Sequence, residues 1–347
     1  MTPYRHSSWR ECDTPSVFDI GELTTIADQI EFSGVAAVAS DGARVSEFAR
    51  GLAHRAHGIP NRVDTRFATA SATKGFTALT AASLIESGEL GLATTFCELV
   101  GRQLPEVDPA VTIEQLLGHT SGVGDYLDEE QLGHIDDHVI GVSAHTLQTP
   151  DDYLPLIDRH PQVSAPGERF AYNNSGYVML SIAIERAGGK PYHELVGERV
   201  FDPAEMKTAD FLRSDELPTA VAHGYLENGR SNIFHLPVVG GGDGGVYLSL
   251  ADMEAFWSAL FAGKIVSDAM VTAMTTPPRE LPEQEPAYGL GFWLRSSADV
   301  VMLEGMDAGV SFRSAHHRSD GRRYTVMANT SSGVWPLVRY LDEQLWS

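Results

Sequence analysis

A serine and a lysine three residues apart, Ser71 and Lys74, are the residues of this chain whose types and spacing point most directly to chemistry. Residues three apart on an α-helix share a face, so the lysine amine can reach the serine hydroxyl. A serine is a weak nucleophile at neutral pH unless a base accepts its proton. A lysine amine becomes such a base only where burial or nearby positive charge disfavours the charged form. The spacing therefore predicts a nucleophile with its own base.

The residues that follow this pair favour such an environment. Residues 75–85 carry no charged side chain, which predicts a buried helix with Ser71 at its N-terminal end. The chain has only four lysines and otherwise uses arginine, which keeps its proton in proteins. We therefore expect burial to desolvate Lys74 and a backbone N–H at the helix start to face an oxyanion.

A tyrosine and an asparagine two residues apart, Tyr172 and Asn174, form a second candidate pair between a Pro-Gly turn and the start of a helix. A phenol can relay a proton to a leaving group, and an amide can hold a substrate carbonyl. The same pattern fits a packed tyrosine followed by a helix-capping asparagine. Taken alone, it leaves both interpretations open.

The composition excludes several partners. The chain of 347 residues has a net charge of −22, which argues against binding to nucleic acid or to an anionic membrane, because both carry dense negative charge. No apolar stretch has the length of a secretory signal or a membrane span, so we expect a cytoplasmic protein. Cys12 and Cys97 match no disulfide framework or zinc spacing, and we expect both to be reduced thiols.

Strand patterns at both ends of the chain indicate how these residues are positioned. Two early strands, 34–40 and 43–48, are expected to form a hairpin around Asp41-Gly42, and later strands are expected at 244–250, 289–294, 299–303, 310–315 and 324–329. The region between them is mostly helical in pattern, and 336–346 predicts a closing amphipathic helix. We therefore predict an α/β domain built from residues 1–95 and 235–347, with a helical subdomain at 96–234 and the active site at their interface.

Three segments in this order resemble the serine β-lactamase and penicillin-binding-protein-like family, including its esterase and D-aminopeptidase branches. Residues 67–78 are similar to the nucleophile segment of that family, residues 113–123 to its Leu-Leu-x-His-Thr-Ser-Gly segment, and residues 172–174 to its Tyr-x-Asn motif. The resemblance covers nearly the whole chain, from about Phe67 to Asn329. It implies an antiparallel sheet flanked by helices in a three-layer α-β-α fold.

The resemblance also implies a role for each matched residue. Ser71 would be acylated, Lys74 and Tyr172 would share the acid and base work, and Asn174 would orient the acyl group. His119 would be structural, positioning a loop, although its type alone would also suit a catalytic base.

The third motif departs from the family pattern, in which a Lys-Thr-Gly or His-x-Gly sequence lines the site. We align Leu303-Glu304-Gly305 with it, because Gly309-Val310-Ser311 then falls on the following Gly-Phe-Ser; an alternative register uses Met306-Asp307-Ala308. Neither register contains a basic residue. Glu304 and Gly305 are then candidate substrate-binding residues, and the backbone N–H groups of Ser71 and Met306 form the expected oxyanion hole.

Two other patterns carry weaker signals. His134 and His138 lie four apart and on a helix could hold a metal, but no third ligand is evident and a solvated acidic face is the expected alternative. The glycine-rich segment 240–245 lacks the ending of a phosphate loop and is expected to form a tight turn that lines the cleft. We expect neither a metal nor a cofactor.

Together these patterns predict a serine hydrolase that acts through an acyl-enzyme on Ser71 and cleaves a small-molecule ester, amide or peptide. Because the acidic third motif should repel a carboxylate, esters and amines are expected substrates ahead of β-lactams. The alternatives are a transacylase that uses an amine or alcohol in place of water, a β-lactamase or D-Ala-D-Ala carboxypeptidase, and a non-catalytic protein that uses the same cleft for binding.

Overall fold

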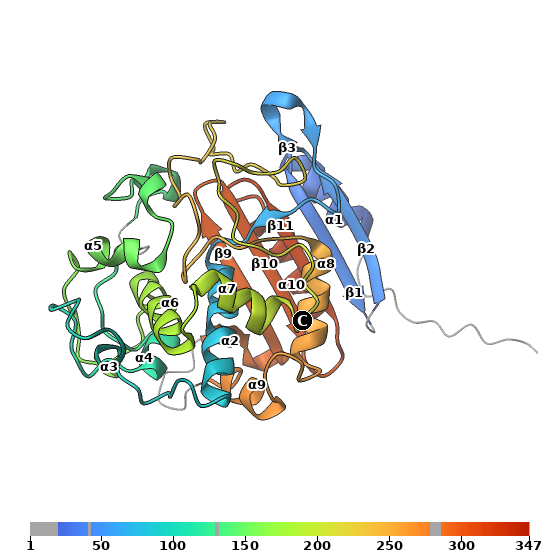
Figure 1. Ribbon diagram of the computed structural model, residues 1–347. Helices are drawn as coiled ribbons and strands as arrows, with labels where there is room; N and C mark the ends of the chain where they lie inside the picture. Colours follow the sequence, from blue (N-terminus) through green and yellow to red (C-terminus); the bar gives the residue numbers. More distant parts are fainter. Residues whose placement is uncertain (1–19, 41–42, 129–131, 278–285, 347) are drawn as a thin grey trace, which may run out of the picture.

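The computed structural model describes residues 20–40, 43–128, 132–277 and 286–346. Its main sheet has seven strands in the order β2-β1-β11-β10-β9-β8-β7, and each neighbouring pair is antiparallel (Figure 1). The strands of this sheet are β1 (Gly34–Ser40), β2 (Ala43–Arg50), β7 (Ala287–Tyr288), β8 (Trp293–Arg295), β9 (Val300–Asp307), β10 (Val310–His317) and β11 (Arg323–Ala328). Two small ribbons pair β3 (Leu52–His54) with β4 (Ile59–Pro60) and β5 (Phe67–Ala68) with β6 (Tyr247–Leu248).

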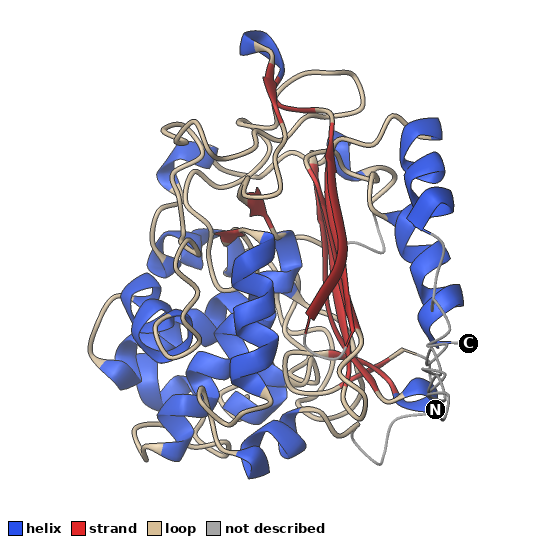
Figure 2. Cartoon of the chain, turned by 90° about the vertical axis from the view of Figure 1, so that its right-hand side faces the viewer, coloured by secondary structure: helices blue, strands red, loops and turns tan. Residues whose placement is uncertain are grey.

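Helices cover both faces of this sheet, which gives the three layers visible in Figure 2. One face packs against α1 (Ile20–Gln29) and α10 (Trp335–Trp346). The other face packs against a larger group that includes α2 (Thr73–Glu86), α6 (Asn174–Gly188), α7 (Tyr192–Val196), α8 (Leu250–Leu260) and α9 (Asp268–Met274). Beyond these lie the short helices α3 (Phe96–Val100), α4 (Ile113–Leu117) and α5 (Leu154–Ile157). The predicted α-β-α fold class is confirmed.

The alternation of side chains along β9 explains how one strand contributes residues to the hydrophobic cores on both faces of the sheet. Val301 and Leu303 belong to the core beneath α2, whereas Met302 belongs to the core beneath α10. Successive residues of a strand point to opposite faces of its sheet. The odd-numbered residues of β9 therefore face the larger helical layer.

Two predicted strands differ from those observed. Residues 244–250 contain only the two-residue strand β6, which lies outside the main sheet, and Leu250 already begins α8. Ser249 caps that helix by accepting a hydrogen bond from the Asp252 N–H, a local signal that outweighs the apolar run. Residues 289–294 do not form one strand, because the chain turns at Gly291, with φ +92°, between β7 and β8.

The hairpin strands, the late strands from β9 onward and the closing helix lie where the sequence predicts them, although Asp41-Gly42 itself falls outside the described residues. The region from 91 to 233 is less helical than predicted. Apart from α6, its α-helices in the described ranges span only four or five residues each, and long irregular segments connect them. The division into two domains stays a prediction.

The described helices include none that is both long and apolar enough to cross a membrane. Cys97 is a partly buried free thiol, and Cys12 lies outside the described residues.

Gly305 of β9 packs directly against the segment that carries Ser71. That segment is the short 3₁₀ helix η2 (Ala70–Ala72), which begins at a residue with a left-handed backbone, φ +47° at Ala70. A Cβ atom at Gly305 would lie 2.2 Å from the Thr69 carbonyl oxygen and 2.7 Å from the Ser71 nitrogen. Only glycine allows the strand to approach η2 this closely.

Gly305→Ala should therefore lower the free energy of unfolding by about 2 kcal/mol, because the added methyl group must displace either β9 or η2. Urea unfolding followed by circular dichroism measures this loss. Gly197→Ala is the matched control, since a Cβ there meets no heavy atom within 4 Å. Equal stability of the two variants would contradict the close packing of β9 on η2.

Candidate active site

Ser71 and Lys74 meet at the start of α2. Ser71 lies in η2, and Lys74 lies in the first turn of α2, where it is only 1% exposed to solvent. The Lys74 Nζ lies 2.9 Å from the Ser71 Oγ, 2.7 Å from the Asn174 Oδ1 and 2.9 Å from the Asp243 carbonyl oxygen. The sequence-predicted pair is therefore in hydrogen-bond contact, within a site formed by three separate segments of the chain.

The chemical types of these three partners suit a lysine that exchanges a proton with serine. A charged amine can donate to all three of them. A neutral amine has two N–H groups and one lone pair, so it can donate to the two carbonyl oxygens and accept the Ser71 hydroxyl proton. The same geometry thus accommodates the amine before and after it takes up the proton.

Asn174 is held in place by hydrogen bonds to Asp125, a residue that the sequence did not point to. Asn174 is the first residue of α6, and the Asp125 carboxylate accepts hydrogen bonds from the backbone N–H groups of Asn174 and Ser175, each at 2.9 Å. The Asn174 side-chain amide also donates to the Leu127 carbonyl oxygen at 2.8 Å. A carboxylate at a helix N-terminus is favourable, but only the tertiary fold brings residue 125 there.

Burial raises the pKa of Asp125 to about 6, because the cost of desolvating its charge exceeds the stabilisation from the backbone N–H groups and from Lys74. Asp125 therefore gains or loses its proton near pH 6, which lies within the pH range commonly used for activity measurements. Above this pKa its carboxylate accepts the hydrogen bonds that fix Asn174 and attracts the nearby lysine amine.

The glycine-rich segment 240–245 supplies the third partner of Lys74 and lines the pocket, as predicted. Within it, the Asp243 side chain accepts a hydrogen bond from the Tyr126 hydroxyl. Asp243 is 7% exposed, and burial raises its pKa, although Lys74 and Tyr126 oppose that shift. The segment therefore brings a carboxylate, as well as a carbonyl, close to Ser71.

Tyr172 lies beside Lys74, whose Nζ is 4.9 Å from the centre of the tyrosine ring. The ring stacks on Trp293 of β8, with centroids 5.8 Å apart. The flanking backbone is fixed by His119: its Nδ1 accepts a hydrogen bond from the Asn173 N–H at 3.1 Å, and its carbonyl oxygen accepts one from Ala171 at 2.8 Å. Burial and Lys74 hold the pKa of His119 well below its usual value. Its contacts are those of a structural residue that positions the Tyr172 segment.

The third motif divides between the two faces of the sheet. Gly305 faces Ser71, but Glu304 points to the opposite face, where its carboxylate pairs with Arg313 of β10. The structure therefore does not bring Glu304 together with the other predicted site residues. Asp307, which the alternative register included, lines the pocket with Ser71 instead.

Met306 follows Gly305 on β9, in the part of the strand beyond Met302, the last β9 residue that pairs with β8. Its side chain is 38% exposed. The Ser71 nitrogen lies against Gly305, so the two expected oxyanion donors belong to adjoining segments. Their role as an oxyanion hole stays a prediction.

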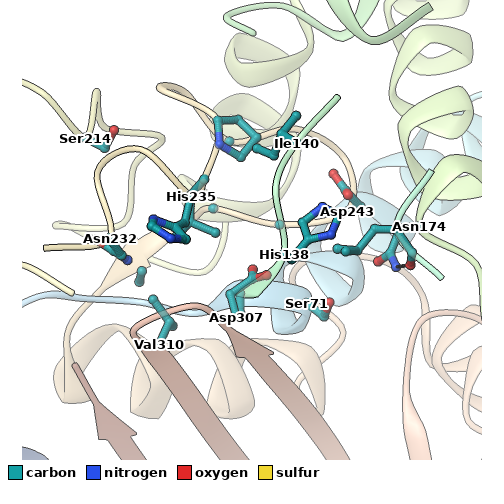
Figure 3. A pocket seen from close by; sticks show the side chains of 18 of the residues that line it. Ser71, His138, Ile140, Asn174, Ser214, Asn232, His235, Asp243, Asp307 and Val310 are labelled. Atoms are coloured by element: carbon teal, nitrogen blue, oxygen red, sulfur yellow. Dashed lines mark hydrogen bonds between the residues drawn. The ribbon is translucent and has the colours of Figure 1, made fainter. Parts of the chain in front are cut away.

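The pocket that contains Ser71 is acidic. Asp243 and Asp307 line it, and its wall includes no lysine or arginine within the described ranges. In Figure 3, Asn174 and Asp243 lie on one side of the view, Ser214, Asn232 and His235 on the other, and Asp307 and His138 between them. Apart from these two carboxylates, two histidines and a set of hydroxyl, amide and apolar side chains form the wall.

His134 and His138, the weak metal candidate, point to different places. His134 pairs with Glu227 at 3.2 Å, whereas His138 lines the pocket. Within the described part of the chain, no group of three or more histidine, cysteine, aspartate or glutamate side chains is placed to hold a metal ion.

An antiparallel sheet between helical layers, with a Ser-x-x-Lys pair at the start of a buried helix, defines a protein of the β-lactamase fold. The chain belongs to the β-lactamase family, whose model, described as Beta-lactamase, matches residues 23–330. The crystal structure of a penicillin-binding protein from Bacillus halodurans is 34% identical, with a TM-score of 0.86, and the match covers 92% of this chain and 99% of that one.

Two curated relatives are named for their reactions. A D-aminopeptidase from Cereibacter sphaeroides is 28% identical, with 85% of this chain and 55% of the relative covered. Esterase EstB from Burkholderia gladioli is 34% identical, with 54% of this chain and 49% of the relative covered. The chain thus spans about half of the length of these two proteins. It spans 62–65% of the length of two other curated relatives, both penicillin-binding proteins of Bacillus subtilis by name.

The raised pKa of Asp125 predicts how activity depends on pH. As the pH falls through about 6, Asp125 takes up a proton and loses the charge that orients Asn174 and Lys74, so kcat/KM should fall with an apparent pKa near 6. Asp125→Asn should be slower at all pH values and should lack this limb of the profile. The exposed Asp137→Asn is the control and should keep it. An unchanged limb in Asp125→Asn would contradict this assignment.

Proposed function

We propose that this protein is a serine hydrolase that forms an acyl-enzyme on Ser71 and cleaves an ester or an amide. The single observation that supports this most strongly is the 2.9 Å contact between the Lys74 Nζ and the Ser71 Oγ, with the lysine also held by two carbonyl oxygens. A hydroxyl paired with a buried base is the arrangement that nucleophilic catalysis requires.

The reaction follows from these positions. The Ser71 Oγ attacks the substrate carbonyl carbon as its proton passes to Lys74, and the backbone N–H groups of Ser71 and Met306 stabilise the oxyanion. The carbon–oxygen or carbon–nitrogen bond then breaks, and the proton returns to the leaving group through Lys74 and Tyr172. Water attacks the acyl-enzyme and releases the acid. An amine or alcohol acceptor in place of water would make the same site a transacylase, as the sequence also allowed.

The charges in the pocket support a choice among substrate classes. Asp243 and Asp307 should repel a substrate carboxylate and tolerate a neutral or cationic group. Among the relatives, this agrees better with the esterase and the D-aminopeptidase than with the penicillin-binding protein. We therefore propose neutral or amine-bearing esters and amides as substrates, ahead of β-lactams.

A fluorophosphonate probe separates this function from the non-catalytic alternative. The probe should add one adduct to the intact protein, at Ser71 by peptide mapping, and Ser71→Ala should take up none. A wild-type protein that stays unlabelled, or a Ser71→Ala variant that labels equally, would sink the hydrolase proposal.

Asp307→Asn should weaken the discrimination against carboxylates. The wild-type protein should cleave p-nitrophenyl butyrate much faster than nitrocefin, which carries a carboxylate. Removing one negative charge from the pocket should narrow the ratio of the two kcat/KM values by about fivefold or more. Glu304→Gln serves as the comparison, because Glu304 lies on the opposite face of the sheet, and it should leave the ratio unchanged. A shift caused by Glu304→Gln and not by Asp307→Asn would contradict the placement of these two carboxylates.

A further inference from the structure

Four side chains in the wall of the Ser71 pocket each carry a buried polar atom without a hydrogen-bond partner among the described residues. These atoms are the Tyr153 hydroxyl, the Ser214 Oγ, the His138 Nε2 and the His235 Nδ1. We refer to these four residues as the polar lobe. Figure 3 shows Ser214 and His235 on the side of the pocket away from Asn174.

Such a concentration of unpaired polar atoms requires an explanation. More than nine in ten buried polar groups in proteins have a hydrogen-bond partner, because burying one without a partner costs free energy. Tyr153, in η6 (Pro150–Tyr153), is the strongest case, since the residue is only 1% exposed and its hydroxyl still lacks a partner. The other three come from separate loops that converge on the same cavity. These atoms are closed to solvent in this structure, so a ligand group would supply the missing partners once the side chains turn toward the cavity they line.

The groups of the polar lobe can each donate and accept hydrogen bonds. Burial, together with Asp243 and Asp307, raises the pKa of Tyr153 well above its usual value, so the phenol keeps its proton. Burial and His235 lower the pKa of His138, so its imidazole is neutral at pH 7. The two hydroxyls and the neutral imidazole of His138 are matched by a partner that also donates and accepts.

The need for a partner that both donates and accepts hydrogen bonds distinguishes the possible ligand groups. A carboxylate only accepts and would meet the charges of Asp243 and Asp307. An ammonium group only donates, so it would leave the protons of the phenol and the serine hydroxyl without acceptors. A hydroxyl group does both, and several hydroxyls on one carbon ring could also donate to the two carboxylates.

The rest of the wall suits the carbon skeleton of such a group. Apolar and aromatic side chains line the pocket around the polar lobe, and they can pack against the C–H faces of a ring: Ile140, Leu212, Ile233, Leu236, Pro237 and Tyr247. We propose that the polar lobe binds a neutral, polyhydroxylated group, such as a sugar or cyclic polyol, in the ester that Ser71 cleaves. This proposal rests on the hydrolase function proposed above and adds a substrate class to it.

Two butyrate esters that differ only in hydroxyl groups test the proposal. Methyl 6-O-butyrylglucoside and cyclohexylmethyl butyrate present similar rings and the same scissile ester, and a pH-stat measures their hydrolysis. The wild-type protein should favour the glucoside by about tenfold in kcat/KM. Tyr153→Phe and Ser214→Ala should each lower kcat/KM for the glucoside by about threefold to tenfold, the range expected for one hydrogen bond, and leave the cyclohexylmethyl ester within twofold.

Both substitutions remove only an atom that has no partner, so neither should lower the Tm. Ser258→Ala, an exposed change in α8, is the matched control and should affect neither ester. Cleavage of both esters without a preference for the glucoside, or an equal loss on both esters in the Tyr153 and Ser214 variants, would overturn the proposal, since water alone would then satisfy the polar lobe. Cleavage of neither ester by the wild-type protein would overturn the hydrolase function and, with it, the proposal.

Discussion

The burial of one lysine amine is the constraint on which the rest of the site depends. A buried amine needs acceptors for its protons, and Lys74 finds them on three segments that are distant in the sequence. The start of α2 provides the Ser71 hydroxyl, the start of α6 provides Asn174, and the glycine-rich loop provides the carbonyl of Asp243. Holding the lysine in place therefore holds these three segments together, and Ser71, the proposed nucleophile, lies where they meet.

The sheet adds a second constraint, because it fixes which side chains can reach the site. Gly305 lets β9 press against η2, and the alternation along the strand turns Asp307 toward the pocket and Glu304 toward α10. The site consequently combines a buried lysine with three carboxylates: Asp125 is partly buried, Asp243 is buried, and Asp307 lines the pocket. We propose that this distribution of charge favours neutral and cationic substrates and that the polar lobe next to it selects among them.

The parts of this arrangement that depend on local spacing could be predicted from the sequence. The Ser71 and Lys74 contact follows from helix geometry, and the long strands and α10 follow from periodicity. Asp125 and the facing of Glu304 could not be predicted, because each depends on how distant segments pack. The acidic pocket wall was anticipated, but with Glu304 as one of its residues, since register alone does not decide which face of β9 meets Ser71. The sequence suggested His138 as a possible metal ligand, whereas the structure places it in the wall of the pocket, apart from His134.

The central claim is that Ser71 carries a covalent acyl group during turnover, with Lys74 as its base. Rapid mixing with p-nitrophenyl butyrate, quenching in acid and intact-protein mass spectrometry test this most directly. The account predicts a mass increase of one butyryl group that maps to Ser71 in the wild-type protein and is absent in Ser71→Ala and Lys74→Met. Steady release of p-nitrophenol without a butyryl group on Ser71, or a butyryl group on another residue, would contradict it.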